Sequence, residues 1–265
     1  MKKKLIMLCA IVIMMGLVVA GCGNSADKDE VYKIATDAFY APMEFMDKGK
    51  IVGFDADFID AVMSEAGLNY QLDNTGWDTM LELVKQGDEY DAGISSISIT
   101  EDRQETYDYS YPYFESTNMI LVPEGSPVKN ALDLKDLEVA VQIMTTADVL
   151  MTEIMGQGNT NLKRFDSNTL AIQELISNGV DAVVADIAIV REYIKNNPDK
   201  KFVGLLDETN FSAEYYGILL PKGSELKAKL DPAIKAVIEN GKYAEIYDKW
   251  FGEEPDTSVL LDQMK

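Results

Sequence analysis

Short apolar runs that alternate with helical patterns restrict the fold more than any other feature of this sequence. The apolar runs predict strands at 32–36, 90–97, 138–143, 180–185, 201–206 and 215–220. Helical spacing predicts one helix capped by Asp55 and ended by Gly67, a second that follows Asp78 and ends near Gly87, and a third that begins at Thr100. Further helices are expected at 146–155, 167–178, 187–195, 224–240 and 242–251. This alternation predicts an α/β fold with mainly parallel sheets and helices on both faces.

Charge and composition exclude several classes of function. The 265 residues include 45 acidic and 24 basic side chains, and the formal charge of −21 argues against a nucleic-acid partner. The chain has no histidine and two cysteines. Ser-His-Asp and Cys-His nucleophile pairs and a four-cysteine metal site are therefore excluded. We expect neither a metal nor a cofactor.

The first 30 residues are typical of an export signal followed by a lipid anchor. Three lysines at positions 2–4 precede an uncharged run at 5–20, which is shorter than the roughly 20 residues of a membrane span. This pattern predicts a secretory signal. Val19-Ala20-Gly21-Cys22 resembles the bacterial lipobox, so we expect 1–21 to be a lipoprotein signal peptide. Cys22 would carry acyl chains in the cell membrane, and 22–30 would form a tether. The alternative is a plain signal peptide with an incidental cysteine.

Polar residues follow the expected strands, where sheets of this kind bind ligands. In residues 94–103 (ISSISITEDR), three serines lead to Thr100 as a helix cap and place Arg103 in the first helical turn. A cation there opposes the helix dipole by roughly 0.3–1 kcal/mol. An anionic ligand would remove this conflict, and the guanidinium fork suits a carboxylate. An ion pair with a surface acid is the alternative, and these residues alone leave both open.

Three other positions offer complementary chemistry. Thr145 and Thr146 open a helix, where N–H groups and hydroxyls either bind an anion or only cap the helix. Asp186 either caps the next helix or receives an ammonium group. Tyr40 and Trp77 either belong to the core or flank a flat or cationic ligand. Together with the arginine, this set complements an L-α-amino acid.

Six separated segments between residues 32 and 252 give the chain a family resemblance. They read ATDAFYAPMEFMDKGKIVGFDADFIDAV, YDAGISSISITEDRQETYDYSYPYF, VAVQIMTT, GVDAVVADIAIV, YYGILLPKGS and YAEIYDKWFG. In this order they resemble the family-3 bacterial solute-binding proteins, the polar amino-acid receptors of ABC importers. The resemblance implies a two-lobed fold of the type II periplasmic-binding-protein kind, which closes on its ligand. Lobe 1 would comprise 31–119 and 217–265, and lobe 2 would comprise 120–216. Crossing strands would lie near 119–122 and 214–217.

The resemblance also implies roles for particular residues. Arg103 would hold the ligand carboxylate, Asp186 would receive its ammonium group, and Asp37 would meet a polar or cationic side-chain end. The other implied contacts come from the aromatic pair Tyr40 and Trp77 around the side chain, from Ser96 and Ser98, from the amides and hydroxyls of Thr145 and Thr146, and from Ser95 and Gln142 along the pocket. The family commonly has glycine at Met144, so we expect this side chain to narrow the pocket or shift its loop.

The resulting expectation is a monomeric receptor outside the cell. It would bind a polar L-amino acid without chemistry and deliver it to ABC permease subunits in the same membrane. Asp37, the two rings and the acidic composition favour arginine, lysine, histidine or glutamine, and cystine is an alternative. Two other classes were weighed: a dehydratase-like enzyme that uses acids such as Asp37 and Glu44, and a lipoprotein that presents its ligand to a separate sensor.

Overall fold

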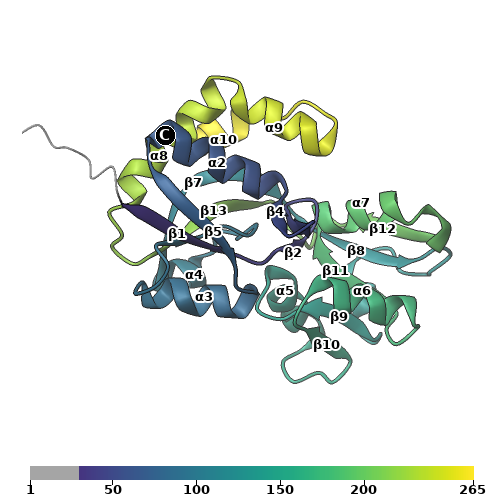
Figure 1. The fold of residues 1–265 in the computed structure, drawn as a ribbon. Coiled ribbons are helices and arrows are strands. Elements are labelled where there is room, and N and C mark those ends of the chain that lie inside the picture. The colour runs from purple at the N-terminus through teal and green to yellow at the C-terminus, as the bar shows by residue number, and fades with distance from the viewer. Residues whose placement is uncertain (1–29) are drawn as a thin grey trace, which may run out of the picture. The chain divides into compact units, whose positions relative to one another are not determined.

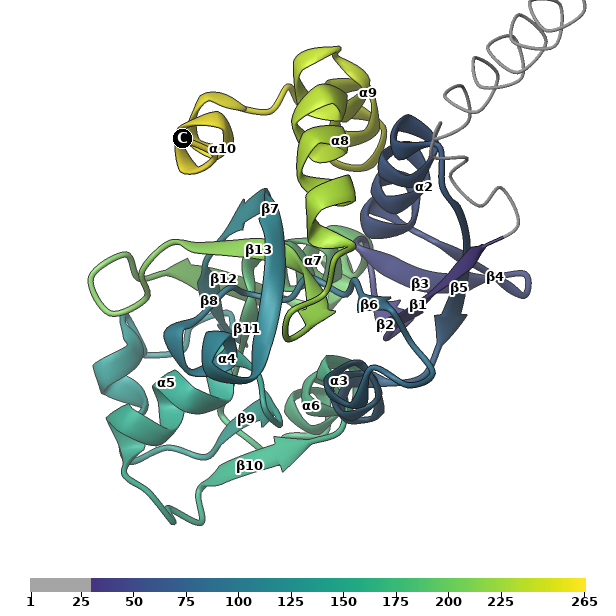
Figure 2. The same ribbon diagram turned by 90° about the vertical axis from the view of Figure 1, so that its left-hand side faces the viewer.

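The computed structural model describes residues 30–265, so the predicted signal peptide and Cys22 lie outside the described residues. Two five-stranded sheets dominate the described part (Figures 1 and 2). Each sheet combines three parallel strands with two strands that run antiparallel to their neighbours. The sequence therefore predicted the α/β class correctly, whereas the sheets are mixed, with two parallel and two antiparallel pairings in each.

The first sheet has the strand order β5-β1-β6-β13-β7. Its strands are β1 (Val31–Thr36), β5 (Asn69–Asn74), β6 (Ala92–Gly93), β7 (Tyr107–Ser116) and β13 (Glu214–Pro221). Helices α2 (Phe54–Ala66), α8 (Lys227–Glu239) and α9 (Lys242–Phe251) pack on one face, and α3 (Trp77–Gln86) packs on the other. Successive side chains of β13 point to opposite faces of the sheet, which explains this arrangement. Ile218 belongs to the buried cluster that includes α2, α8 and α9, whereas its neighbour Leu219 belongs to the cluster that includes α3.

The second sheet has the order β10-β9-β11-β8-β12. Its strands are β8 (Asn118–Pro123), β9 (Val139–Gln142), β10 (Leu162–Phe165), β11 (Ala182–Asp186) and β12 (Phe202–Leu206). Helices α6 (Asn168–Ile176) and α7 (Ile187–Asn196) cover one face. On the other face lie α5 (Thr146–Met155) and the short helix η1 (Ala131–Leu134). A second short helix, η2 (Pro198–Lys200), precedes β12.

The chain passes between the two sheets twice. It leaves β7 and enters β8 at Thr117, and it returns through residues 207–213 between β12 and β13. Residues 119–122, where the first crossing was expected, lie inside β8 and pair with β11 and β12.

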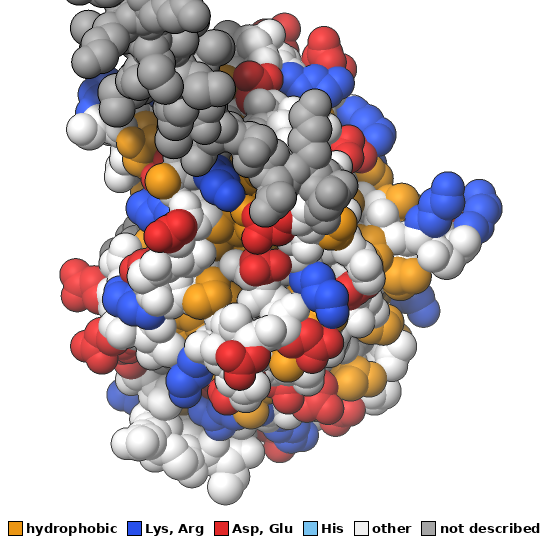
Figure 3. All heavy atoms as spheres, turned by 60° about the vertical axis from the view of Figure 1, so that its left-hand side comes forward, with side chains coloured by type: hydrophobic (Ala, Val, Ile, Leu, Met, Phe, Trp, Pro, Cys, Tyr) orange, Lys and Arg blue, Asp and Glu red, His pale blue; other side chains and the backbone are white. Residues whose placement is uncertain are grey.

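Several smaller elements complete the fold. Strands β2 (Phe39–Tyr40), β3 (Glu44–Asp47) and β4 (Lys50–Val52) form a three-stranded sheet. Helix α4 (Glu101–Thr106) precedes β7, and α10 (Ser258–Gln263) lies near the C-terminus. Acidic and basic side chains are interspersed over the face drawn in Figure 3. None of the helices in residues 30–265 is both long and apolar enough to cross a membrane.

The structure corrects two predicted helix caps and one strand. The N-caps of α2 and α3 are Gly53 and Gly76, not Asp55 and Asp78. Asp55 lies inside α2 and is fully buried, and its carboxylate accepts hydrogen bonds from the Ser96 N–H and the Tyr113 hydroxyl. The strand expected at 90–97 is reduced to two residues, because Ser96 has a φ of 51° and an extended ladder cannot continue through that conformation.

Candidate functional site

Ten side chains from both large sheets and their connections line one small cavity. They are Tyr40, Trp77, Ser95, Ser96, Ser98, Arg103, Gln142, Thr145, Thr146 and Asp186. The set contains every site residue expected from the sequence except Asp37, which lies behind Gln142 at 3.5 Å between Oδ2 and Nε2. Residues more than 140 positions apart in the chain therefore converge on one place.

Arg103 has neutral partners. Thr100 is the N-cap of α4, as predicted, and its hydroxyl accepts a hydrogen bond from the Arg103 N–H at 3.2 Å. The guanidinium donates to the carbonyls of Ser98 and Met144, both at 2.9 Å, and lies 5.4 Å from the centre of the Trp77 ring. Within residues 30–265 no ion pair involves Arg103, so the surface ion pair considered from the sequence does not form there.

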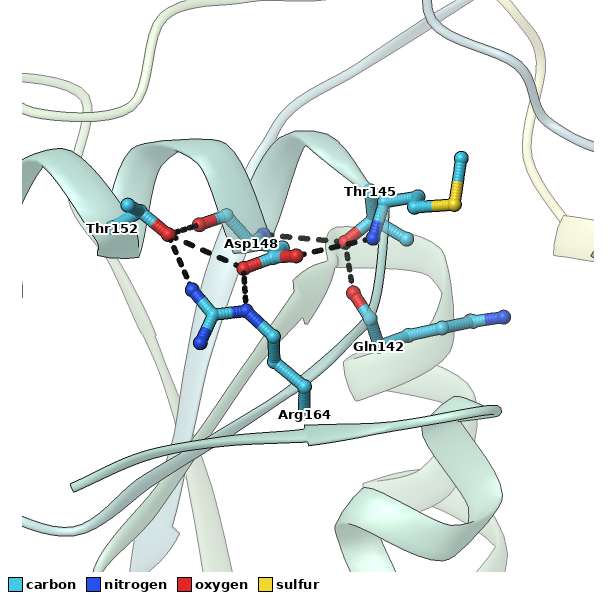
Figure 4. A network of polar contacts seen from close by, with 6 residues as sticks. Gln142, Thr145, Asp148, Thr152 and Arg164 are labelled. Carbon is cyan, nitrogen blue, oxygen red and sulfur yellow. Dashed lines mark hydrogen bonds and ion pairs between the residues drawn. The ribbon is translucent and has the colours of Figure 1, made fainter. Parts of the chain in front are cut away.

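A polar network fixes the loop before α5 (Figure 4). Thr145 is the N-cap: its hydroxyl accepts from the Asp148 N–H at 3.3 Å and donates to the Gln142 carbonyl at 2.8 Å. The Asp148 carboxylate accepts from the Met144 N–H at 3.1 Å and from Arg164 Nε at 2.7 Å. The Thr145 hydroxyl is therefore used for capping, whereas the Thr146 hydroxyl donates a hydrogen bond to Glu214.

Met144 does not narrow the cavity. It adopts a φ of 62°, the left-handed region that glycine occupies without strain, and its side chain is 49% exposed. It is absent from the residues that line the cavity. The loop reaches Arg103 through the Met144 carbonyl instead. A methionine at this position is compatible with an open site because its side chain points away from it.

Asp186 occupies the N-cap position of α7, but its side chain makes no capping hydrogen bond. Instead, its Oδ2 accepts hydrogen bonds from the hydroxyls of Tyr40 at 2.6 Å and Tyr216 at 2.5 Å. Burial raises the pKa of Asp186, while the two tyrosines and Arg103 act in the opposite direction. Both tyrosines use the same oxygen, so Oδ1 is the atom placed to receive a further donor. Asp186 therefore does more than occupy the cap position of α7.

Glu214 is a site residue that the sequence analysis missed. Its Oε2 accepts from Ser98 Oγ at 2.6 Å and from Thr146 Oγ1 at 2.9 Å, and its Oε1 accepts from Asn118 Nδ2 at 2.6 Å. Burial and the nearby Asp186 carboxylate raise the pKa of Glu214 to about 7. Its position at the start of β13 carries no local signal of this role, because every one of these partners is distant in sequence.

Asp37 directly follows the last residue of β1 and is 4% exposed. Its N–H donates to Ser95 Oγ at 3.2 Å. Burial raises the pKa of its carboxyl group to about 6, against the hydrogen bond from Gln142, which lowers the pKa. A cation placed here would favour the ionised form of this carboxyl group.

A buried pair of acids lies beneath the serine-rich loop. Glu44 and Asp55 are both fully buried, and their two carboxyl groups interact directly. Asp55 also accepts from the Ser96 N–H at 2.7 Å and from the Tyr113 hydroxyl at 2.9 Å, while Ser95 donates to Glu44 at 2.5 Å. Burial and the Asp55 charge hold the pKa of Glu44 well above its usual range, which favours a proton on Glu44 that the pair shares. The pair supports the loop and does not line the cavity.

Comparison with known proteins places this site in a family. Residues 32–253 match the model of the bacterial extracellular solute-binding proteins, family 3. The chain belongs to this family. The resemblance inferred from the six sequence segments is thereby confirmed, and so is the two-lobed fold class that it implied.

Individual relatives cover most of the chain. A probable histidine-binding protein of Neisseria gonorrhoeae is 37% identical over 251 residues, which cover 90% of this chain and 92% of the relative. The arginine-, lysine-, histidine-binding protein ArtJ of Geobacillus stearothermophilus is 52% identical with a TM-score of 0.85, covering 88% of this chain and all of that one. An ancestral arginine-binding protein, solved with arginine, is 35% identical with a TM-score of 0.79 and covers 84% and 98%.

Proposed function

We propose that this solute-binding protein captures a cationic L-amino acid, arginine first, outside the cell and passes it to an ABC permease. The pattern of charges around the cavity carries this proposal. Arg103, Asp186 and Asp37 offer one positive and two acidic groups at separate places. A cationic amino acid carries one carboxylate, one ammonium group and one side-chain cation. The two patterns are complementary.

Each group of the ligand then has a partner of opposite charge. The carboxylate pairs with the Arg103 fork, whose present acceptors are only neutral carbonyls. The ammonium group pairs with Oδ1 of Asp186, and the side-chain cation reaches Asp37, which it would ionise. Tyr40 and Trp77 line the space between. The names of the similar proteins, which bind arginine, lysine or histidine, agree with this order of preference over glutamine and cystine.

Closure of two lobes gives the capture mechanism. In this proposal, lobe 1 comprises 31–119 and 217–265, and lobe 2 comprises 120–216. Contacts that join the proposed lobes at the cavity include Tyr40 with Asp186, Arg103 with the Met144 carbonyl, and Ser98 with Glu214. A ligand that contacts both lobes would shift the population towards the closed form, which a permease can recognise.

Three further features belong to the same proposal. The lipobox supports anchoring of a monomer to the outer face of the cell membrane through Cys22. Binding without chemistry is supported by the binding proteins among the relatives. It is also supported by the position of Glu44, an acid considered for an enzyme, which is paired with Asp55 outside the cavity lining.

Isothermal titration calorimetry with the purified protein, stripped of carried-over amino acid by unfolding and refolding, tests the proposal. We expect arginine, lysine and histidine to bind more tightly than glutamine, cystine or glutamate. Arg103→Ala and Asp186→Asn should each weaken arginine binding by about 10–100-fold, because each removes a charged hydrogen-bonding partner. Arg191→Ala, which removes an exposed arginine of α7, is the matched control and should bind normally. Selective binding of glutamate, or full affinity in Arg103→Ala, would contradict the proposal.

Asp37 separates recognition of the side chain from recognition of the amino-acid backbone. Asp37→Asn should weaken arginine binding by about tenfold or more, because it removes the acidic partner of the side-chain cation. Glutamine has no such cation, so its affinity should change little. An equal loss for both ligands would show that Asp37 acts through the structure of the loop and not through charge.

A further inference from the structure

Glu214 already uses hydrogen-bond donors that an amino-acid carboxylate would need. Its Oε2 accepts from Ser98 and Thr146, and both of these side chains line the cavity. A hydroxyl group has one proton to donate, so each can serve only one carboxylate at a time. The Glu214 carboxylate and a ligand carboxylate therefore compete for the same two protons.

The charges of the site leave Glu214 without a counterpart on the ligand. On the proposed function, on which this inference rests, Arg103, Asp186 and Asp37 each pair with one charge of the ligand. Glu214 is a fourth charged group. It is not a lining residue, but it is hydrogen-bonded to Ser98 and Thr146 at the end of the cavity where the ligand carboxylate would bind. Two carboxylates at that end would repel each other in a partly buried place. Protonation of one of them removes the repulsion.

We propose that Glu214 takes up a proton from solvent when the amino acid binds. The ligand carboxylate accepts the hydroxyl protons of Ser98 and Thr146, and the new O–H of Glu214 becomes a donor in the same cluster. The only bond formed is this O–H bond, and the buffer loses one proton for each Glu214 that was ionised before binding. Asn118, fully buried, keeps its contact with the other carboxyl oxygen.

The surrounding groups set the direction of the effect. Asp186 raises the pKa of Glu214, and Arg103 lowers it. The charge of Glu214 in turn helps to raise the pKa of the nearby Tyr40 hydroxyl. A bound ammonium group would neutralise Asp186, and a bound carboxylate would engage Arg103. These two changes oppose each other, so the loss of the two hydroxyl donors to the ligand carboxylate decides the direction. The net change favours protonated Glu214 in the complex.

A pH dependence of binding follows. With a pKa of about 7 before binding, Glu214 is mostly ionised above that pH. Affinity for arginine should therefore fall as the pH rises from 7 to 8.5, by at most about tenfold per pH unit for one proton. Asp37, with a pKa of about 6, is already ionised in this range and contributes little. The arginine side chain stays charged throughout.

Calorimetric titration of arginine at pH 8 in buffers of different ionisation enthalpy measures the proton count directly. The unsubstituted protein should take up between about 0.4 and 0.9 protons per arginine, the range for a group with a pKa near 7 that moves above 8. Glu214→Gln keeps an oxygen acceptor but cannot ionise, so its proton uptake and the pH dependence of its affinity should fall to the small part that the α-amino group of free arginine supplies. Glu115→Gln, an exposed acid of β7, is the matched control and should keep the uptake.

The outcomes separate the two proposals. Arginine binding without proton uptake by the unsubstituted protein, a result that needs no variant, overturns the inference and leaves the proposed function intact. Uptake that is undiminished in Glu214→Gln assigns the proton to another group and also overturns it. The absence of binding heat for any amino acid refutes the proposed function, and the inference with it.

Discussion

The buried acids Glu44 and Asp55 allow a prediction in which two substitutions of one residue differ sharply. If Glu44 holds the shared proton, its Oε2–H donates to Asp55 Oδ1 while its Oε1 accepts from Ser95. Without that proton, Glu44 Oε2 and Asp55 Oδ1 would be two buried oxygens with no hydrogen-bond partner. Glutamine can reproduce both contacts, since its amide donates at one end and accepts at the other. Alanine can reproduce neither.

The magnitude follows from the contacts. Glu44→Gln should change the free energy of unfolding by less than about 1 kcal/mol, the size of one neutral hydrogen bond. Glu44→Ala leaves the Ser95 hydroxyl and the Asp55 carboxylate without their buried partner. At about 1–3 kcal/mol for each orphaned group, plus the space left by the side chain, the loss should be about 3–6 kcal/mol.

Urea unfolding at pH 7, analysed by linear extrapolation, measures both values. Glu65→Gln, an exposed acid of α2, controls for the change of charge and should be neutral. Infrared spectroscopy should detect a protonated carboxylic acid at pH 7 that disappears in Glu44→Gln. If glutamine destabilises the protein as much as alanine does, or if no protonated acid is found, Glu44 is ionised and the reasoning fails.

Two further predictions concern the backbone and pH. Gly53 has a φ of 139°, and a Cβ there would lie 2.1 Å from the Met43 carbonyl oxygen, so Gly53→Ala should cost about 3 kcal/mol or more in urea unfolding. Gly67→Ala, at a φ of 68° in open space, should cost only about 1 kcal/mol, and equal losses would contradict the steric argument. The folded protein raises the pKa of Asp55 to about 6 and of Glu214 to about 7, so it binds more protons than the unfolded chain. The free energy of unfolding should therefore decrease from about pH 4 to pH 8, and a rise over that range would refute these pKa shifts.

Local signals were sufficient for many elements of the fold. The expected helices at 146–155 and 242–251 coincide with α5 and α9. In α5, the threonine cap and the regular spacing of apolar residues indicate the same helix boundaries that packing in the folded protein produces. The start of α2 was misplaced because Gly53, in a conformation that only glycine tolerates, precedes an aspartate that looked like a cap. The strand at 90–97 was overextended because an apolar run does not reveal the positive φ of Ser96.

The site residues that could be predicted are those that belong to a sequence motif and also follow the end of an expected strand. Arg103 and Asp186 each follow a strand, and the structure places both at the cavity. Glu214 and Asp148 were missed, because each acquires its role from partners on other elements. No periodicity or local motif reports such contacts. The same limit applies to Asp55, whose burial against Ser96 depends on tertiary packing.

The most direct test of the central claim compares ligands that differ by one charged group. The account assigns separate partners to the carboxylate, ammonium group and side-chain cation of one L-amino acid. Calorimetric titration should therefore show tight binding of L-arginine and a loss of about 10–100-fold or more for agmatine, which lacks only the carboxylate that Arg103 would hold. Equal binding of agmatine and L-arginine, or binding of neither, would contradict the account.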